Sequence, residues 1–211
     1  MSRPDPSEQS ERERIVAAAR RMVEAGGVDA LSMRKLAADL GVAHTAIYWH
    51  VGGRDDLVNA VVDSFLADLG EITPRGRSPR QRMASIANQI REQVVEHRAL
   101  VALAMEHGRF SAMWFPAQVA LAREVSAAGL TGADAARAVT SLLYVTGAFV
   151  MLESAMDEHA AESQATASLW RGVEEPAIDN TLRTRMAKGV DTAAVFDDVL
   201  NAVLDSIGEK H

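Results

Sequence analysis

The sequence predicts an all-α protein, and three observations support that fold class. Proline occurs at only six of 211 positions, namely 4, 6, 74, 79, 116 and 176. The long stretches between these prolines are rich in Ala, Leu, Arg, Glu and Met, which favour helices. Apolar residues recur at helical spacing, and Val-rich alternation of the strand type is absent.

The first expected helix follows a polar, flexible tail that we place at residues 1–11. Its apolar stripe follows the spacing i, i+3, i+4, i+7, i+8 through Ile15, Ala18, Ala19, Met22 and Val23. Gly26 and Gly27 end this helix. Ser32 can cap a second helix that Gly41 ends, and its apolar face consists of Met33, Leu36, Ala37 and Leu40.

A short helix is expected at about 44–50 and a longer one at about 54–69, with Asp55 and Asp56 in its first turn. Residues 71–79 are expected to form a loop. Ser78 and Pro79 suit the N-cap and first position of the next helix. We expect further helices at about 79–97, 99–109 and 113–128.

The later part of the chain contains a long helix at about 132–156, where Thr131 and Asp134 resemble a capping box. This helix is apolar on nearly every side, so we expect its own domain or a partner subunit to bury it. Residues 157–190 are polar, with a weak helical signal at 162–171. Asp191 can cap a last helix at about 192–208.

Composition excludes several function classes. The absence of cysteine rules out disulfides, thiolate zinc sites and a thiol nucleophile, and it is compatible with the cytoplasm, where we expect the protein. The N-terminus is polar, unlike a signal peptide, and no apolar run approaches the roughly 20 residues of a membrane span. The formal charge of −7 at first argues against a nucleic-acid partner.

Residues 32–51, SMRKLAADLGVAHTAIYWHV, contradict that last inference. Ala37, Gly41 and Ile47 stand at the offsets of a helix-turn-helix. The small Ala37 lets two helices cross closely, Gly41 can take the positive φ of the turn, and Ile47 can fill the core. The second helix of such a unit lies in the DNA major groove.

Position within this motif gives its polar residues their expected roles. His44, Thr45 and Ala46 would face base edges, while Tyr48, Trp49 and His50 can donate to phosphates. Arg34, Lys35 and Arg54 supply positive charge. The alternatives are plain ones: solvated surface charges, an exposed histidine without a role, and Tyr48 or Trp49 as packing aromatics.

Residues 12–70 resemble the DNA-binding region of the TetR family of bacterial transcriptional regulators. The matching segments are ALSMRKLAADLGV, AIYWHV and GRDDLVNAV, and later ones include EHRAL and MLES. The resemblance implies a homodimer that binds palindromic operator DNA, usually as a repressor, and a small-molecule effector that releases it. It implies dimer contacts through the helices at about 132–156 and 192–208.

The expected domains follow from this resemblance: a tail at 1–11, a helix-turn-helix domain at 12–52, a linking helix at 53–70, and a helical ligand-binding and dimerisation domain at 71–211. Adaptable apolar side chains suit the effector pocket. The candidate lining residues are Met105, His107, Phe110, Met113, Trp114, Met151, Glu153 and Trp170. We expect no metal or other cofactor and no membrane partner.

Two alternative functions remain. Glu153, Asp157 and His159 could bind a metal in an enzyme, but no catalytic motif accompanies them, so we expect no enzyme. The C-terminal part could also serve dimerisation alone. Arg75, Arg77, Arg80 and Arg82 are expected to be solvated.

Charge placement favours the DNA hypothesis. Residues 1–66 hold eight basic and ten acidic residues, but Asp39 is the only acid between Arg34 and Arg54. We therefore expect weak non-specific affinity, with binding that depends on the dimer and on a few contacts.

Overall fold

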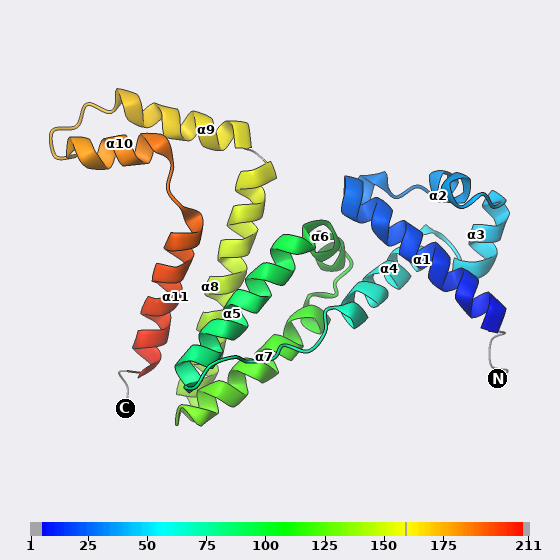
Figure 1. Cartoon of the computed structure of the whole chain (residues 1–211), viewed down its shortest axis with the longest axis horizontal. Coiled ribbons are helices and arrows are strands. Elements are labelled where there is room, and N and C mark those ends of the chain that lie inside the picture. The colour runs from blue at the N-terminus through cyan, green and yellow to red at the C-terminus, as the bar shows by residue number, and fades with distance from the viewer. Residues whose placement is uncertain (1–5, 159, 209–211) are drawn as a thin grey trace. The chain divides into compact units, whose positions relative to one another are not determined.

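The structure is a computed structural model that describes residues 6–158 and 160–208 (Figure 1). Throughout these two ranges the regular elements are helices, with two short 3-10 turns and no strand. The predicted all-α class is therefore confirmed.

Residues 6–70 contain four helices and one 3-10 turn: α1 (Pro6–Gly26), η1 (Val28–Ala30), α2 (Met33–Leu40), α3 (His44–Val51) and α4 (Arg54–Asp68). The following elements are α5 (Pro79–Glu96), α6 (Arg98–Glu106), α7 (Phe110–Ala127), α8 (Gly132–Glu158), α9 (Ala160–Leu169), η2 (Trp170–Gly172), α10 (Asn180–Lys188) and α11 (Thr192–Gly208).

The start of α1 differs from the expected flexible tail at residues 1–11. The helix begins at Pro6 and includes residues 6–11. Glu11 and Arg14, one turn apart, form an ion pair of 2.9 Å. Such i, i+3 pairs stabilise a polar helix end that an apolar stripe does not mark.

Helix α10 lies in a region that the sequence analysis treated as polar and poorly periodic. It buries no residue, so it lacks the apolar stripe on which the prediction depended. Its N-cap is Asp179, whose carboxylate accepts from the N–H groups of Thr181 (2.6 Å) and Leu182 (3.0 Å). These backbone bonds, that of Leu182 first, lower the pKa of Asp179 below its ordinary value.

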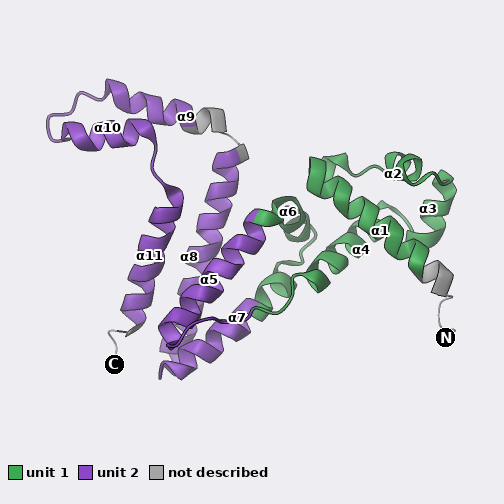
Figure 2. Cartoon of the chain, in the orientation of Figure 1, with its two compact units in different colours: residues 1–72, 96–116 green, residues 73–95, 117–211 purple. Residues whose placement is uncertain are grey.

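The chain forms two compact units (Figure 2). Unit 1 holds residues 1–72 and 96–116, and unit 2 holds residues 73–95 and 117–211. The first boundary falls close to the end of the predicted linking helix. However, α6 and the beginning of α7 belong to the compact unit that contains α1–α4, although they were assigned to the C-terminal domain.

Unit 1 has a continuous apolar core. Its fully buried side chains come from all four N-terminal helices and from α6, and include Ile15, Leu36, Ile47, Leu57, Phe65, Leu100 and Leu103. Arginine ion pairs connect its elements, among them Arg20 of α1 with Asp68 of α4, and Arg109, just before α7, with Asp63 of α4.

Unit 2 is built on the packing of α8 against α11. Its buried side chains include Met83, Ile86, Leu121, Leu142, Phe196 and Leu204. Asp191 caps α11 as predicted, accepting from the N–H groups of Ala193 (3.0 Å) and Ala194 (3.3 Å).

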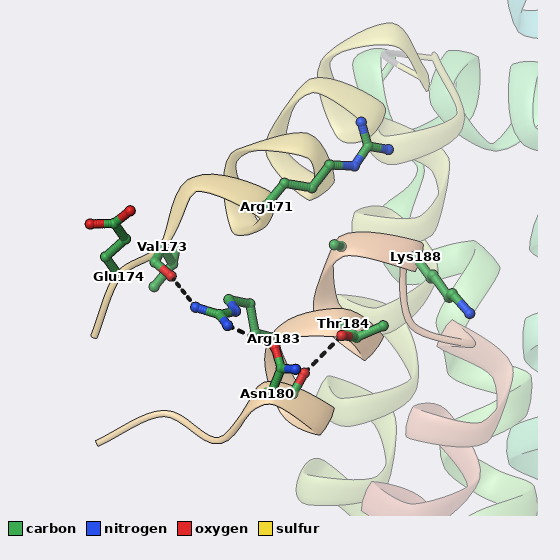
Figure 3. Close-up of a pocket in the computed structure, with 8 residues that line it drawn as sticks. Arg171, Val173, Glu174, Asn180, Arg183, Thr184 and Lys188 are labelled. Carbon is green, nitrogen blue, oxygen red and sulfur yellow. Dashed lines mark hydrogen bonds between the residues drawn. The ribbon is translucent and has the colours of Figure 1, made fainter. Parts of the chain in front are cut away.

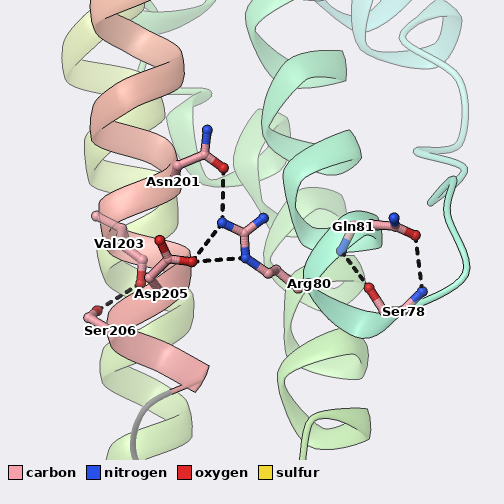
Figure 4. Close-up of polar contacts among 7 residues, drawn as sticks. All are labelled: Ser78, Arg80, Gln81, Asn201, Val203, Asp205 and Ser206. Carbon is pink, nitrogen blue, oxygen red and sulfur yellow. Dashed lines mark hydrogen bonds and ion pairs between the residues drawn. The ribbon is translucent and has the colours of Figure 1, made fainter.

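All four arginines at 75–82 were expected to be solvated, but two of them, Arg80 and Arg82, have partners in other helices. Figure 4 shows Arg80 of α5 donating to Asp205 (2.7 Å) and Asn201 (3.0 Å) of α11. Arg82 pairs with Glu124 of α7 at 2.6 Å, with both side chains largely covered. These two arginines therefore join helices of unit 2.

The stretch 132–157 of α8 is long and apolar enough to cross a membrane by length and composition, contrary to the expectation that no such run exists. A core helix of a soluble protein meets the same criterion. This finding is therefore weak evidence for a membrane span.

Candidate nucleic-acid interface

The turn between α2 and α3 has the geometry that the sequence motif predicts. Ser32 caps α2 by accepting from the Lys35 N–H at 3.4 Å. Gly41 ends the helix with φ +68°, a left-handed conformation that glycine adopts without strain. The Val42 N–H then donates to the Ala37 carbonyl at 3.0 Å, which closes the turn.

Buried apolar side chains fix α3 within unit 1. Ile47 is fully buried, Val51 and Ala37 are nearly so, and α3 packs against both α1 and α2. With Ile47 and Val51 turned toward the core, the opposite side of α3 faces solvent. The sequence motif alone assigned Ile47 to this role.

The exposed side of α3 carries the predicted contact residues. His44 and Thr45 are exposed, while Ala46 and His50 are half-buried. Tyr48 is 46% exposed and Trp49 is 67% exposed, so neither is a core aromatic. Both aromatic side chains are therefore accessible to a binding partner.

Contacts between aromatic rings hold the exposed side chains of α3 in defined orientations. The His44 and Tyr48 rings meet edge to face with centroids 5.1 Å apart, and those of Trp49 and His50 do so at 4.8 Å. The i, i+4 spacing places His44 above Tyr48 on one helix face.

Three cationic side chains flank α3. Arg34 and Lys35 are exposed in the first turn of α2, and Arg54 is exposed at the first position of α4. The Gly53 N–H donates to the Asp56 carboxylate at 2.8 Å, which fixes the start of α4 beside Arg54. All nine predicted DNA contacts therefore belong to one compact unit.

The predicted effector residues are divided between the two units. Met105, His107, Phe110, Met113 and Trp114 belong to unit 1, and Met151, Glu153 and Trp170 belong to unit 2. Phe110 and Met151 are exposed, and the others except Glu153 are half-buried. Trp114 has a buried Nε1–H that meets no acceptor among the described residues.

Glu153 has a structural partner that the sequence analysis missed. Arg91 of α5 donates to its two carboxylate oxygens at 2.9 and 2.7 Å, and the guanidinium lies over the Phe196 ring at 5.3 Å. The hydrogen bond with Glu153 raises the pKa of Arg91 above its ordinary value. Arg91 lies 62 residues earlier in the chain, so no local pattern indicates the pair.

This pairing weakens the metal alternative. The Glu153 carboxylate is engaged by Arg91, and the described residues contain no group of three or more His, Asp or Glu that could hold a metal. His159, the third member of the proposed set, lies outside the described residues.

A polar pocket of about 550 Å³ lies between η2 and α10 in unit 2 (Figure 3). Its lining residues are Arg171, Val173, Glu174, Asn180, Arg183, Thr184, Ala187 and Lys188. Arg183 donates to the Val173 carbonyl and to the Asn180 side chain, both at 2.7 Å. None of the predicted effector residues lines it, and the sequence analysis missed it because α10 was not predicted.

Family models match both parts of the chain. Residues 15–61 match "Bacterial regulatory proteins, tetR family", and residues 74–210 match "Tetracyclin repressor-like, C-terminal domain". The chain belongs to the TetR family. It is therefore a DNA-binding transcriptional regulator of the helix-turn-helix class, with the fold class predicted from its sequence.

Individual relatives match along most of this TetR-family chain. The class A tetracycline repressor of Escherichia coli is 28% identical over 203 residues, covering 93% of this chain and 89% of the relative. ActR of Streptomyces coelicolor, solved with actinorhodin, has a TM-score of 0.68 at 22% identity, covering 93% and 95% of the two chains. BioQ, solved with its double-stranded DNA operator, has a TM-score of 0.56 at 21% identity, covering 94% and 98%.

Proposed function

We propose that this TetR-family protein is a cytoplasmic homodimeric repressor that binds a palindromic operator and is released by a small molecule. The observation that carries the proposal is the exposed face of α3. This face presents His44, Thr45, Tyr48 and Trp49 to solvent while Ile47 and Val51 hold the helix in the core.

In the proposed complex α3 lies in the major groove, with its first turn toward the base edges. The phosphates are contacted by two groups of side chains. The first comes from α3 itself (Tyr48, Trp49 and His50), and the second from the flanking cations (Arg34, Lys35 and Arg54). BioQ, a protein of the same fold, was solved with its double-stranded DNA operator, which supports the proposal of operator binding. Two α3 helices of a dimer would bind half-sites roughly 34–36 Å apart.

Exposed apolar side chains of α8 and α11 support the proposed dimer. Tyr144 and Leu152 of α8 are 72% and 57% exposed, and Val195 of α11 is partly exposed as well. Exposed apolar groups of this size favour burial in an interface. A two-fold arrangement would pair α8 and α11 of one protomer with the same helices of its partner.

For the effector we propose an apolar molecule that carries a hydrogen-bond acceptor. Trp114 supports this class, because a buried N–H without an acceptor costs about 1–3 kcal/mol, which an acceptor on the effector would recover. The other proposed lining residues of the same unit are Met105, His107, Phe110 and Met113. Met151, Glu153 and Trp170 belong to unit 2, and their role in effector binding stays a prediction from the sequence. The complex of ActR with actinorhodin supports a small-molecule effector.

Coupling to DNA has a physical basis within unit 1. The α6–α7 segment that carries Trp114 is part of the same compact unit as α1–α4, and Arg109 of this segment pairs with Asp63 of α4. An effector that displaces the segment would therefore disturb α4, the helix that follows α3.

A thermal-shift screen followed by a gel-shift assay tests the proposal. Compounds that raise the melting temperature by binding the native state should also release the protein from DNA that flanks its gene. A Trp114→Phe variant should keep operator affinity and lose response to acceptor-bearing compounds. Stabilising compounds that leave the DNA complex intact would contradict the release mechanism.

A further inference from the structure

The recognition helix α3 lacks the side chains that make bidentate contacts to base edges. Between His44 and Val51 it contains no Arg, Lys, Asn, Gln, Asp or Glu. In the major groove, Arg and Lys contact guanine, Asn and Gln contact adenine, and Asp and Glu contact cytosine. This helix must therefore distinguish base pairs by other means.

The first turn of α3 offers small apolar groups instead. Ala43, the N-cap, is exposed, as is Thr45, while Ala46 is half-buried. These side chains extend no further than a methyl group at Cβ or Cγ, so the helix backbone can approach the bases closely. The apolar group that the major groove presents is the C5 methyl of thymine.

Hydrogen bonding from this turn is limited to two side chains. Thr45 provides a hydroxyl, and His44 provides one imidazole donor in its neutral form. The edge-to-face contact with Tyr48 orders the His44 ring on the exposed side of the helix. Neither group presents the fixed pair of hydrogen-bonding atoms that makes a bidentate contact to one base, so each discriminates less than such a pair.

We propose that α3 selects its half-site chiefly through thymine methyl groups, contacted by Thr45 and Ala46, with His44 as the accompanying hydrogen-bond donor to a base. This inference rests on the proposed operator binding and specifies what the protein recognises in that operator. The ligand is duplex DNA with thymines at the positions that face the first turn of α3.

Deoxyuridine substitution tests this proposal, because it removes the C5 methyl and leaves the base-pairing groups unchanged. The operator is first selected from a random duplex pool with the full-length dimer. Each thymine of a half-site is then replaced together with its symmetry mate, and affinity is measured by fluorescence anisotropy at fixed salt.

We expect the loss of one contacted methyl to weaken binding about four-fold per half-site, from the transfer free energy of one methylene-sized group. Replacing a symmetric pair should therefore weaken binding about sixteen-fold. Thymines in the flanking DNA outside the selected palindrome serve as controls and should tolerate replacement.

Two variants of the exposed Thr45 separate its methyl from its hydroxyl. Thr45→Val keeps the methyl, so the penalty for deoxyuridine at the position facing residue 45 should persist. Thr45→Ser removes the methyl, so that penalty should disappear while penalties elsewhere remain. Equal melting temperatures would show that both variants fold.

Two results would overturn the inference. One is a strongly preferred operator in which deoxyuridine is neutral at every thymine and Arg34→Ala abolishes a preference for guanine, which would place base recognition on α2. The other is a Thr45→Ser variant with an unchanged deoxyuridine penalty. A chain that prefers no DNA sequence would instead refute the proposed function, and this inference with it.

Discussion

Arg91 and Glu153 stabilise unit 2 through a largely buried ion pair, with side chains 26% and 10% exposed. Arg91→Met leaves the Glu153 carboxylate without its partner, so we expect a loss of about 3 kcal/mol in the free energy of unfolding. The value lies at the lower end for buried pairs because Arg91 is partly exposed. Urea denaturation measures it.

The exposed pair of Arg137 and Asp134 provides the matched control. Arg137→Met should cost about 0–1 kcal/mol, since solvent screens that pair. Replacing both Arg91 and Glu153 by apolar residues should recover part of the stability, because no uncompensated charge remains. Equal losses from the two single variants would show that the Arg91 pair has no special role.

Arg54 permits a second prediction at this scale. If it contacts phosphate, Arg54→Ala should weaken binding to all DNA sequences alike. It should also reduce the slope of log affinity against log salt by about one per protomer. Arg123→Ala, an exposed arginine of α7, is the control and should change neither quantity. An unchanged Arg54→Ala affinity would refute the docking model.

Single-residue roles could be predicted where a local pattern determines them. Ser32, Gly41 and Ile47 have the predicted conformation or burial because capping, turn geometry and helical spacing are local properties. The partner of Glu153 could not be predicted, since Arg91 approaches it only after distant helices pack together.

The α2–α3 turn depends on the left-handed conformation of Gly41. A Cβ added there would meet no atom within 4 Å, so Gly41→Ala carries a conformational cost without a steric clash. We expect a loss of about 1–2 kcal/mol in stability. Gly41→Asn should lose less, because asparagine tolerates this conformation better. Thermal or urea unfolding measures both, and equal stability of wild type and Gly41→Ala would contradict this account.

Prediction of whole elements succeeded where apolar residues that become buried recur at helical spacing. The helices 44–51, 54–68 and 192–208 fall within one or two residues of their expected bounds. Helix α10 was not predicted because none of its side chains is buried. Helix α1 was expected to begin later because its first turns are polar.

For the whole molecule, the proposed dimer gives a direct prediction. Leu152→Arg places a charge on the exposed apolar side of α8, so it should convert dimers to monomers and strongly reduce operator affinity. Size-exclusion chromatography with light scattering measures the change. Leu182→Arg, on an exposed apolar residue of α10, is the control and should remain dimeric. A dimeric Leu152→Arg protein would place the interface elsewhere.

The division into units shows why domain organisation is only partly visible in the sequence. The boundary between the two units near residue 72 coincides with a loop that contains proline and glycine, and such a loop is a local signal in the sequence. Inclusion of residues 96–116 in unit 1 depends on long-range contacts such as Arg109 with Asp63 and Phe65 with His97. Helix periodicity contains no information about those contacts.

The most direct test of the central claim is the ratio of affinities for a selected palindrome and for a scrambled duplex, measured by fluorescence anisotropy at physiological salt. If the exposed face of α3 recognises an operator, the ratio should reach about a thousand or more. It should decrease strongly in a variant that combines His44→Ala with Thr45→Ala. Equal affinities for the two duplexes, or a ratio unchanged by that variant, would contradict the claim.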